Sequence, residues 1–240
     1  MRSFKKKKNI FSLKHKSIYI ISGNMEYLKK MKTIQNTMLE FLDDEEENQE
    51  LFDDLSKLLN FQQEFPDINE LKKILYLIYG ISRDHQRKPF FFDKIKKIIL
   101  LLKNEIKQTF SNAQIFRLFI NNKAILLILI DESILTLDSN ILQEIKYEEK
   151  FFYPEIIKND DKYEPSEEIP EFYDEIRRKG ENNSYICELI RADNIEEFII
   201  YVTKNLISLS TTIEPSIYET NSFLEIKTPR LIEYAAFFGS

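Results

Sequence analysis

The residues best suited to acid–base chemistry lie together in a charged stretch, residues 82–88. Asp84 precedes His85, and Arg87 and Lys88 follow. A carboxylate beside a histidine can orient the ring so that it acts as a general base. No nucleophile motif lies nearby, so a solvated charged loop is the simpler interpretation. A helical enzyme with its site around this stretch stays open as an alternative function.

The chain offers little to a metal ion or a nucleotide. Its two histidines and one cysteine cannot form a standard structural zinc set unless all three converge. Cys187 stands among apolar residues at helical spacing, where a small buried hydrophobic residue is the expected role. The four glycines are isolated, so the sequence contains no phosphate-binding loop of the P-loop type. We therefore predict that the protein is not an enzyme and holds no metal and no cofactor.

Composition favours a helical protein with a substantial core. Of 240 residues, 43% are hydrophobic and 13% aromatic, while only 4 are glycine and 7 proline. The net charge of −6 argues against bulk nucleic-acid binding, and the longest apolar run is too short to cross a bilayer. A single cysteine fits a reducing compartment. We predict a cytoplasmic protein whose partners are neither nucleic acid nor membrane.

Residues 1–24 differ from the rest of the chain, because they are rich in lysine and show no helical period. We expect them to be disordered or a non-native extension, without contacts to the folded part. The run Lys5–Lys8 gives a second alternative, in which it acts as a nuclear localisation signal or binds acidic lipids. The protein would then be a nuclear or membrane-targeted adaptor.

Residues 25–150 carry the apolar spacing of amphipathic helices. The first helix begins at Met25, and capping boxes at Asp67–Glu70 and Ser111–Gln114 mark two later helix starts. The apolar run 124–130 is predicted as a buried helix, with a strand left open because so short a run fits both. We predict at least five helices here and no sheet of three or more strands. The fold class is therefore all-α, with an irregular helical N-terminal region.

The composition changes in residues 151–178. This segment combines many acidic residues with Pro154, Pro165 and Pro170. Proline and charge without apolar periodicity indicate a linker. We expect it to separate the helical region from the last part of the chain.

Residues 179–240 open with the pattern of a helix hairpin. Two short helical stretches, Tyr185–Ala192 and Ile195–Lys204, are separated by Asp193–Asn194. Asn194 can cap the second stretch together with Glu197. The short connection predicts two antiparallel helices in contact.

The end of the chain, Thr228–Ser240, resembles the first helix of an ankyrin repeat, whose signature is T-P-L-H-x-A. Ala235 and Ala236 are the small residues that allow close stacking, Tyr234 takes an apolar core position, and Gly239 supplies the turn before a second helix. The chain stops before that second helix. Because a solenoid unit needs stacked neighbours, we expect a longer parent protein in which further repeats follow.

The match to the signature is imperfect. When the alanines are aligned, the threonine and proline slots fall on Arg230–Leu231, and the histidine slot holds Glu233. The pair Thr228–Pro229 lies two residues too early. Such departures are those of a degenerate ankyrin unit.

Four stretches of the chain resemble, in amino-acid sequence, a large ankyrin-containing family of trichomonad protists: Ile186–Arg191, Ile195–Val202, Ser216–Leu224 and Leu231–Ser240. In that family a helical region of unknown function precedes a divergent ankyrin array. The resemblance implies that residues 179–240 form the first one to one-and-a-half ankyrin-like helix-turn-helix units. It brings no biochemical activity. It implies a non-catalytic interaction or scaffold protein whose array binds other proteins.

The resemblance also implies a set of packing residues within the two units. The set comprises Phe198, Val202, Leu231, Tyr234, Ala235, Ala236 and Gly239. All of them except Ala236 and Gly239 are expected to meet in one cluster. Phe237 or Phe238 should be left partly exposed, where a following helix would cover it.

Overall fold

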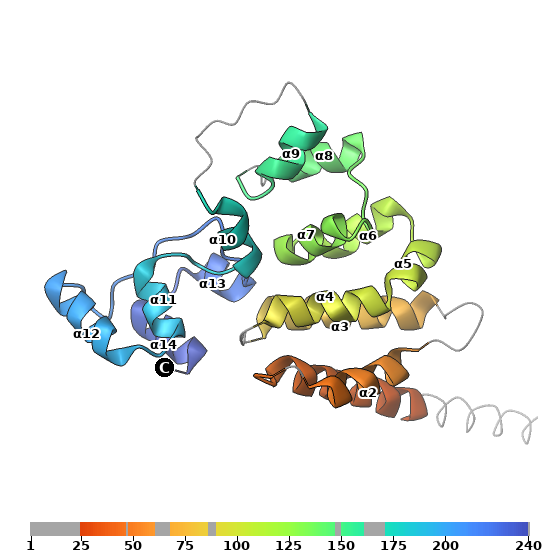
Figure 1. Ribbon diagram of the computed structural model, residues 1–240, viewed down its shortest axis with the longest axis horizontal. Coiled ribbons are helices and arrows are strands. Elements are labelled where there is room, and N and C mark those ends of the chain that lie inside the picture. The colour runs from red at the N-terminus through yellow and green to blue at the C-terminus, as the bar shows by residue number, and fades with distance from the viewer. Residues whose placement is uncertain are drawn as a thin grey trace, which may run out of the picture. The chain divides into compact units, whose positions relative to one another are not determined.

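The computed structural model describes residues 25–46, 48–60, 68–85, 90–146, 150–160 and 171–239. In these ranges every regular element is a helix, which confirms the all-α fold class (Figure 1). The chain divides into two compact units, Met1–Gln62 and Gln63–Ser240, and each is described by itself. Residues 1–24, which we expect to be disordered or a non-native extension, lie outside the described residues. The predicted capping residue Asp67 also lies outside them.

The first unit contains a helix over residues 25–43 and helix α2, Gln49–Leu59. Asn48 caps α2, because its side-chain oxygen accepts a hydrogen bond from the backbone nitrogen of Leu51 at 3.2 Å. Apolar residues at helical spacing on both helices are buried inside this unit. The buried residues are Ile34, Met38, Phe41, Leu42, Leu55 and Leu59.

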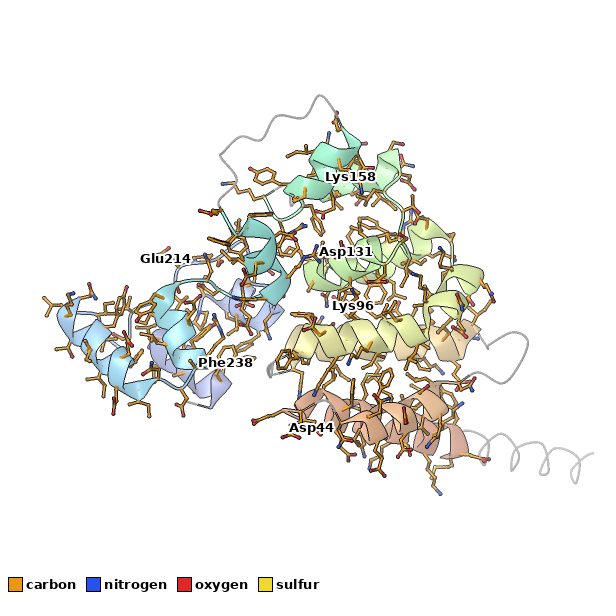
Figure 2. All side chains as sticks on the ribbon, viewed as in Figure 1. Asp44, Lys96, Asp131, Lys158, Glu214 and Phe238 are labelled. Carbon is orange, nitrogen blue, oxygen red and sulfur yellow. The ribbon has the colours of Figure 1, made fainter. Side chains whose placement is uncertain are left out.

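The second unit begins with six helices. They are α3 (Ile68–Asp84), α4 (Phe91–Leu101), α5 (Lys103–Thr109), α6 (Asn112–Phe119), α7 (Lys123–Asp131) and α8 (Ser139–Ile145). The capping box at Ser111 and Gln114 is present at the start of α6. Lys96 on α4 reaches the end of α7, where its Nζ lies 2.6 Å from the carboxylate of Glu132 (Figure 2).

The apolar run 124–130 lies inside α7, so the strand left open for it does not occur. Ile125, Leu126, Leu127 and Leu129 are all buried. A helix that is apolar on nearly every side is stable only when it is covered nearly all round. The helical interpretation of this run is therefore confirmed, and α7 is a central element of its unit.

The predicted linker, residues 151–178, is described only at its two ends. Both described ends of this segment are helical, as α9 (Tyr153–Asn159) and α10 (Tyr173–Lys179), and residues 161–170 lie outside the described part. Pro154 occupies the first turn of α9, where its missing N–H costs nothing. Phe151, Phe152 and Tyr153 are buried. Pro154 therefore lies in a helix start within an ordered part of the chain.

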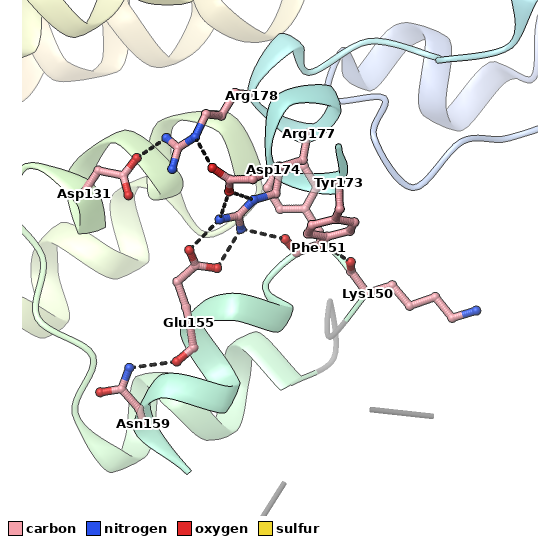
Figure 3. Close-up of polar contacts among 9 residues, drawn as sticks. All are labelled: Asp131, Lys150, Phe151, Glu155, Asn159, Tyr173, Asp174, Arg177 and Arg178. Carbon is pink, nitrogen blue, oxygen red and sulfur yellow. Dashed lines mark hydrogen bonds and ion pairs between the residues drawn. The ribbon is translucent and has the colours of Figure 1, made fainter. Parts of the chain in front are cut away.

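A buried ion-pair network joins α10 to α9 (Figure 3). Arg177, only 1% exposed, donates two hydrogen bonds of 2.7 Å to the carboxylate of Glu155 and one of 3.0 Å to the carbonyl of Phe151. Burial alone would lower the pKa of Arg177, but its bonds to Glu155 and Asp174 raise it, so the guanidinium stays charged. The charges pair within the protein, which is the condition for burying them.

The remaining helices of the second unit are α11 (Tyr185–Arg191), α12 (Ile195–Lys204), α13 (Ser222–Lys227) and α14 (Leu231–Phe238). They do not form a separate body, because α13 packs against α3 and the carboxylate of Glu225 lies 2.7 Å from Nζ of Lys123. Gly180 has a φ of 67°, and a Cβ there would lie 2.7 Å from Oγ1 of Thr220 and 2.9 Å from the ring of Phe92. Only glycine permits this approach.

Candidate interaction surface

The helix hairpin lies where the sequence predicts it. Helices α11 and α12 contact each other, and Asp193 between them has a φ of 49°, in the left-handed region. Asn194 caps α12 by accepting the backbone N–H of Glu197 at 3.2 Å. On the outer side of the hairpin, the hydroxyl of Tyr185 donates to the carboxylate of Glu197 at 2.7 Å.

The core between α11 and α14 is one hydrophobic cluster. Its buried members are Cys187, Ile190, Ile213, Leu224, Leu231 and Tyr234. Of the predicted packing residues, Leu231 and Tyr234 are buried in this cluster, and Phe198 and Ala235 are half-buried against it. Phe237 and Phe238 are also half-buried against it.

The other predicted packing residues lie elsewhere. Val202 is half-buried on α12, outside the cluster, and Ala236 is exposed. Gly239 follows α14 with a φ of 76° and its N–H donates to the carbonyl of Ala235. Glycine at this position ends the helix without strain.

A polar contact closes one edge of the cluster. The guanidinium of Arg191 donates to the hydroxyl of Tyr234 at 2.6 Å and lies 2.9 Å from the carboxylate of Glu181. Burial raises the pKa of Tyr234 and also that of Cys187. Both groups are therefore neutral near pH 7, and the buried thiol packs within the cluster.

Helix α14 is held at its start by an extended segment. Thr212 and Arg230 form an isolated antiparallel bridge, and the backbone nitrogen of Ile213 donates to the carbonyl of Pro229 at 2.9 Å. Arg230 is the N-cap residue, and its N–H donates to the carboxylate of Glu233 at 2.8 Å. The helix thus begins at Leu231 and not at the threonine–proline pair.

Helix α12 has no buried residue, although most of its side chains are apolar. Ile195, Ile199 and Ile200 are 61%, 56% and 65% exposed. The helix lies at the outer edge of its unit, beside α11 (Figure 1). Its inner side carries Phe198, and the isoleucines point away from the cluster.

Leu206 extends this apolar surface past the end of α12. It is 92% exposed and has a φ of 53°, a backbone conformation that favours glycine. The N–H of Ile207 donates to the carbonyl of Val202 at 2.9 Å, which completes a Schellman-type helix end. Nothing in the local sequence singles out Leu206, because leucine is an unusual residue for this position. We call Ile195, Ile199, Ile200 and Leu206 the α12 face.

The charged stretch 82–88 is described only in part, since Arg87 and Lys88 lie outside the described residues. Both carboxylate oxygens of Asp84 accept hydrogen bonds from Arg83, at 2.8 and 2.5 Å. The ring of His85 stacks on that of Phe91, with centroids 6.4 Å apart. Among the described residues, no group of three histidine, cysteine, aspartate or glutamate side chains is placed to hold a metal ion.

A groove of about 490 Å³ lies where α4 begins and α10, α11 and α14 end. Its lining includes Phe90, Phe91, Phe92, Arg178, Lys179 and Phe238. Arg178 pairs with Asp131 and Asp174 (Figure 3). Nζ of Lys179 lies 3.4 Å from the carboxylate of Glu175. These cations are already matched by carboxylates of the same unit. Arg178 and Lys179 therefore do not indicate which ligand the groove would bind, because carboxylates of the same unit already neutralise their charges.

Across the described ranges, no helix is both long and apolar enough to cross a membrane. No family model matches the chain, and neither a curated protein nor a solved structure matches it.

Proposed function

We propose that this protein is a non-catalytic interaction protein of the ankyrin-repeat type, and that it binds another protein through the α12 face. One observation carries the proposal: α12 has no buried residue, and its three isoleucines are more than half exposed. A partner protein with an apolar helix would cover it.

The exposed side chains of the α12 face are large and apolar. Burying an isoleucine or leucine completely contributes about 1.5–3 kcal/mol. All four members of the α12 face are more than half exposed, so most of that free energy is not realised in the isolated chain. Exposed apolar side chains that gather on one element often mark a protein–protein contact site.

Three features support the ankyrin-type arrangement. Helix α11 packs against both α12 and α14, as the first helix of a unit does with its own second helix and with its neighbour. Asp193 and Gly239 both adopt left-handed backbone conformations after α11 and α14. Ser184 and Arg230 are the N-cap residues of these helices, and the same number of residues separates each cap from its left-handed residue.

The cytoplasm is the compartment we propose for this function. Cys187 is a free, buried thiol, and a chain that needs no disulfide is suited to a reducing environment.

Site-specific photo-crosslinking in cells that express the protein naturally tests the proposal. A photoreactive amino acid at position 200 should crosslink to one defined protein, identified by mass spectrometry. The same probe at Gln143, exposed on α8, is the matched control and should give no such product. Ile199→Glu should abolish the product at position 200 while leaving the fold intact. Equal products at both positions, or a product that survives Ile199→Glu, would contradict the proposal.

A further inference from the structure

We infer that the side of the α12 face that carries Ile200 pairs with the same side of a second copy of this chain, with the two α12 helices antiparallel about a two-fold axis at Ile200. This inference rests on the proposed function and names the partner for the same surface. A two-fold contact uses one surface patch twice, so the patch must be complementary to itself.

The charges on α12 meet that requirement. Glu196 lies one helical turn before Ile200, and Lys204 lies one turn after it, so all three side chains share one side of the helix. Both charged residues are exposed, and within the described residues neither takes part in an ion pair. In an antiparallel pair centred on Ile200, Glu196 of each copy comes opposite Lys204 of the other. A parallel pair would place like charges together.

Ile200 lies on the axis, where it meets its own copy. It is 65% exposed and lies on the side of α12 away from Phe198, the residue of this helix that packs against the cluster. Ile195 lies about 140° from Ile200 around the helix, so it stays outside this contact.

The dimer should be weak, because the surface is small. Helix α12 has 10 residues and so spans about 15 Å. An interface built on one such helix falls below the ~1,200 Å² of a standard stable complex. Self-association should therefore be measured at protein concentrations up to about 1 mM.

Charge reversal on α12 tests the pairing. Analytical ultracentrifugation should show a monomer–dimer equilibrium, and Glu196→Lys or Lys204→Glu alone should weaken it by about tenfold or more, since each places two like-charge pairs in the interface. The double variant Glu196→Lys with Lys204→Glu restores both pairs and should return the dissociation constant to within about threefold of the original. Glu144→Lys on α8, an exposed charge reversal away from the surface, should leave it unchanged. Circular dichroism checks that all variants stay helical.

A chain that is monomeric throughout the concentration range would overturn the inference, and so would a dimer that ignores both single reversals. Neither result would overturn the proposed function, which fails only if crosslinking at position 200 captures no specific protein. If the inference holds, the protein captured at position 200 is this chain itself.

Discussion

Leu206 has a left-handed backbone and an exposed apolar side chain. Replacing it with glycine should stabilise the fold and weaken binding, so the two effects can be measured separately. Its left-handed backbone costs an ordinary residue about 1–2 kcal/mol relative to glycine. Because the side chain is 92% exposed, its removal takes almost no buried surface from the folded chain. Glycine adds about 0.5–1 kcal/mol of entropy to the unfolded state, which offsets part of the gain.

The free energy of unfolding of Leu206→Gly should therefore rise by about 0.5–1 kcal/mol, measured by urea denaturation. The melting temperature should rise by roughly 1–4 °C in a chain of this size. Binding through the α12 face should weaken by about tenfold, because a leucine buried by a partner contributes on the order of 1.5–3 kcal/mol.

Ser133→Gly is the matched control for this substitution. Ser133 ends α7 in the same helix-end geometry, with a φ of 55° and the N–H of Ile134 donating to the carbonyl of Leu129 at 2.9 Å. It lies outside the α12 face, so its replacement should stabilise the chain and leave binding unchanged. A Leu206→Gly variant that loses stability would refute the strain argument. One that gains stability and binds as before would remove Leu206 from the surface.

Three further predictions concern the fold. Arg177→Ala should lower the free energy of unfolding in urea by about 3–5 kcal/mol, because Glu155 is left buried without its partner, and adding Glu155→Leu should recover most of that loss. Gly180→Ala should cost about 2 kcal/mol or more, since its Cβ would clash with a threonine hydroxyl, whereas Gly239→Ala, also left-handed but in open space, should cost about 1 kcal/mol. Equal costs would contradict the packing described. Hydrogen bonds, first from a backbone N–H of α8, lower the pKa of Asp138, so its contribution should be complete above about pH 4 and lost as pH falls through the lowered value. Asp138→Asn should then flatten the acid side of a stability–pH curve, and an unchanged curve would exclude this role.

Helix starts were predicted correctly where they depend on a local capping signal. The capping box at Ser111 and the polar cap at Asn194 are both formed, because each depends on residues within one helical turn. For the apolar run within α7, the spacing alone could not exclude a strand. The residues that cover this helix come from other parts of the chain. Proline at position 154 looked like a linker signal, but the buried aromatic residues around it decided for a helix.

The interaction surface could be predicted only in part. Tyr234 and Leu231 follow from the resemblance to an ankyrin helix, and both are buried in the cluster beside α11. The sequence could not show that α12 is covered on one side only, since its isoleucines look like core residues. Leu206 carried no signal at all, because its left-handed conformation depends on how α12 ends and on the packing of Ile207.

The most direct test of the α12 face as a binding surface is hydrogen exchange measured by mass spectrometry. The chain would be compared alone and in complex with the protein captured at position 200, a second copy included. Peptides covering Ile195–Leu206 should exchange at least about tenfold more slowly in the complex, while those covering α8 should be unchanged. Protection confined to other helices, with exchange in Ile195–Leu206 unaltered, would contradict the proposal that this protein binds its partner through α12.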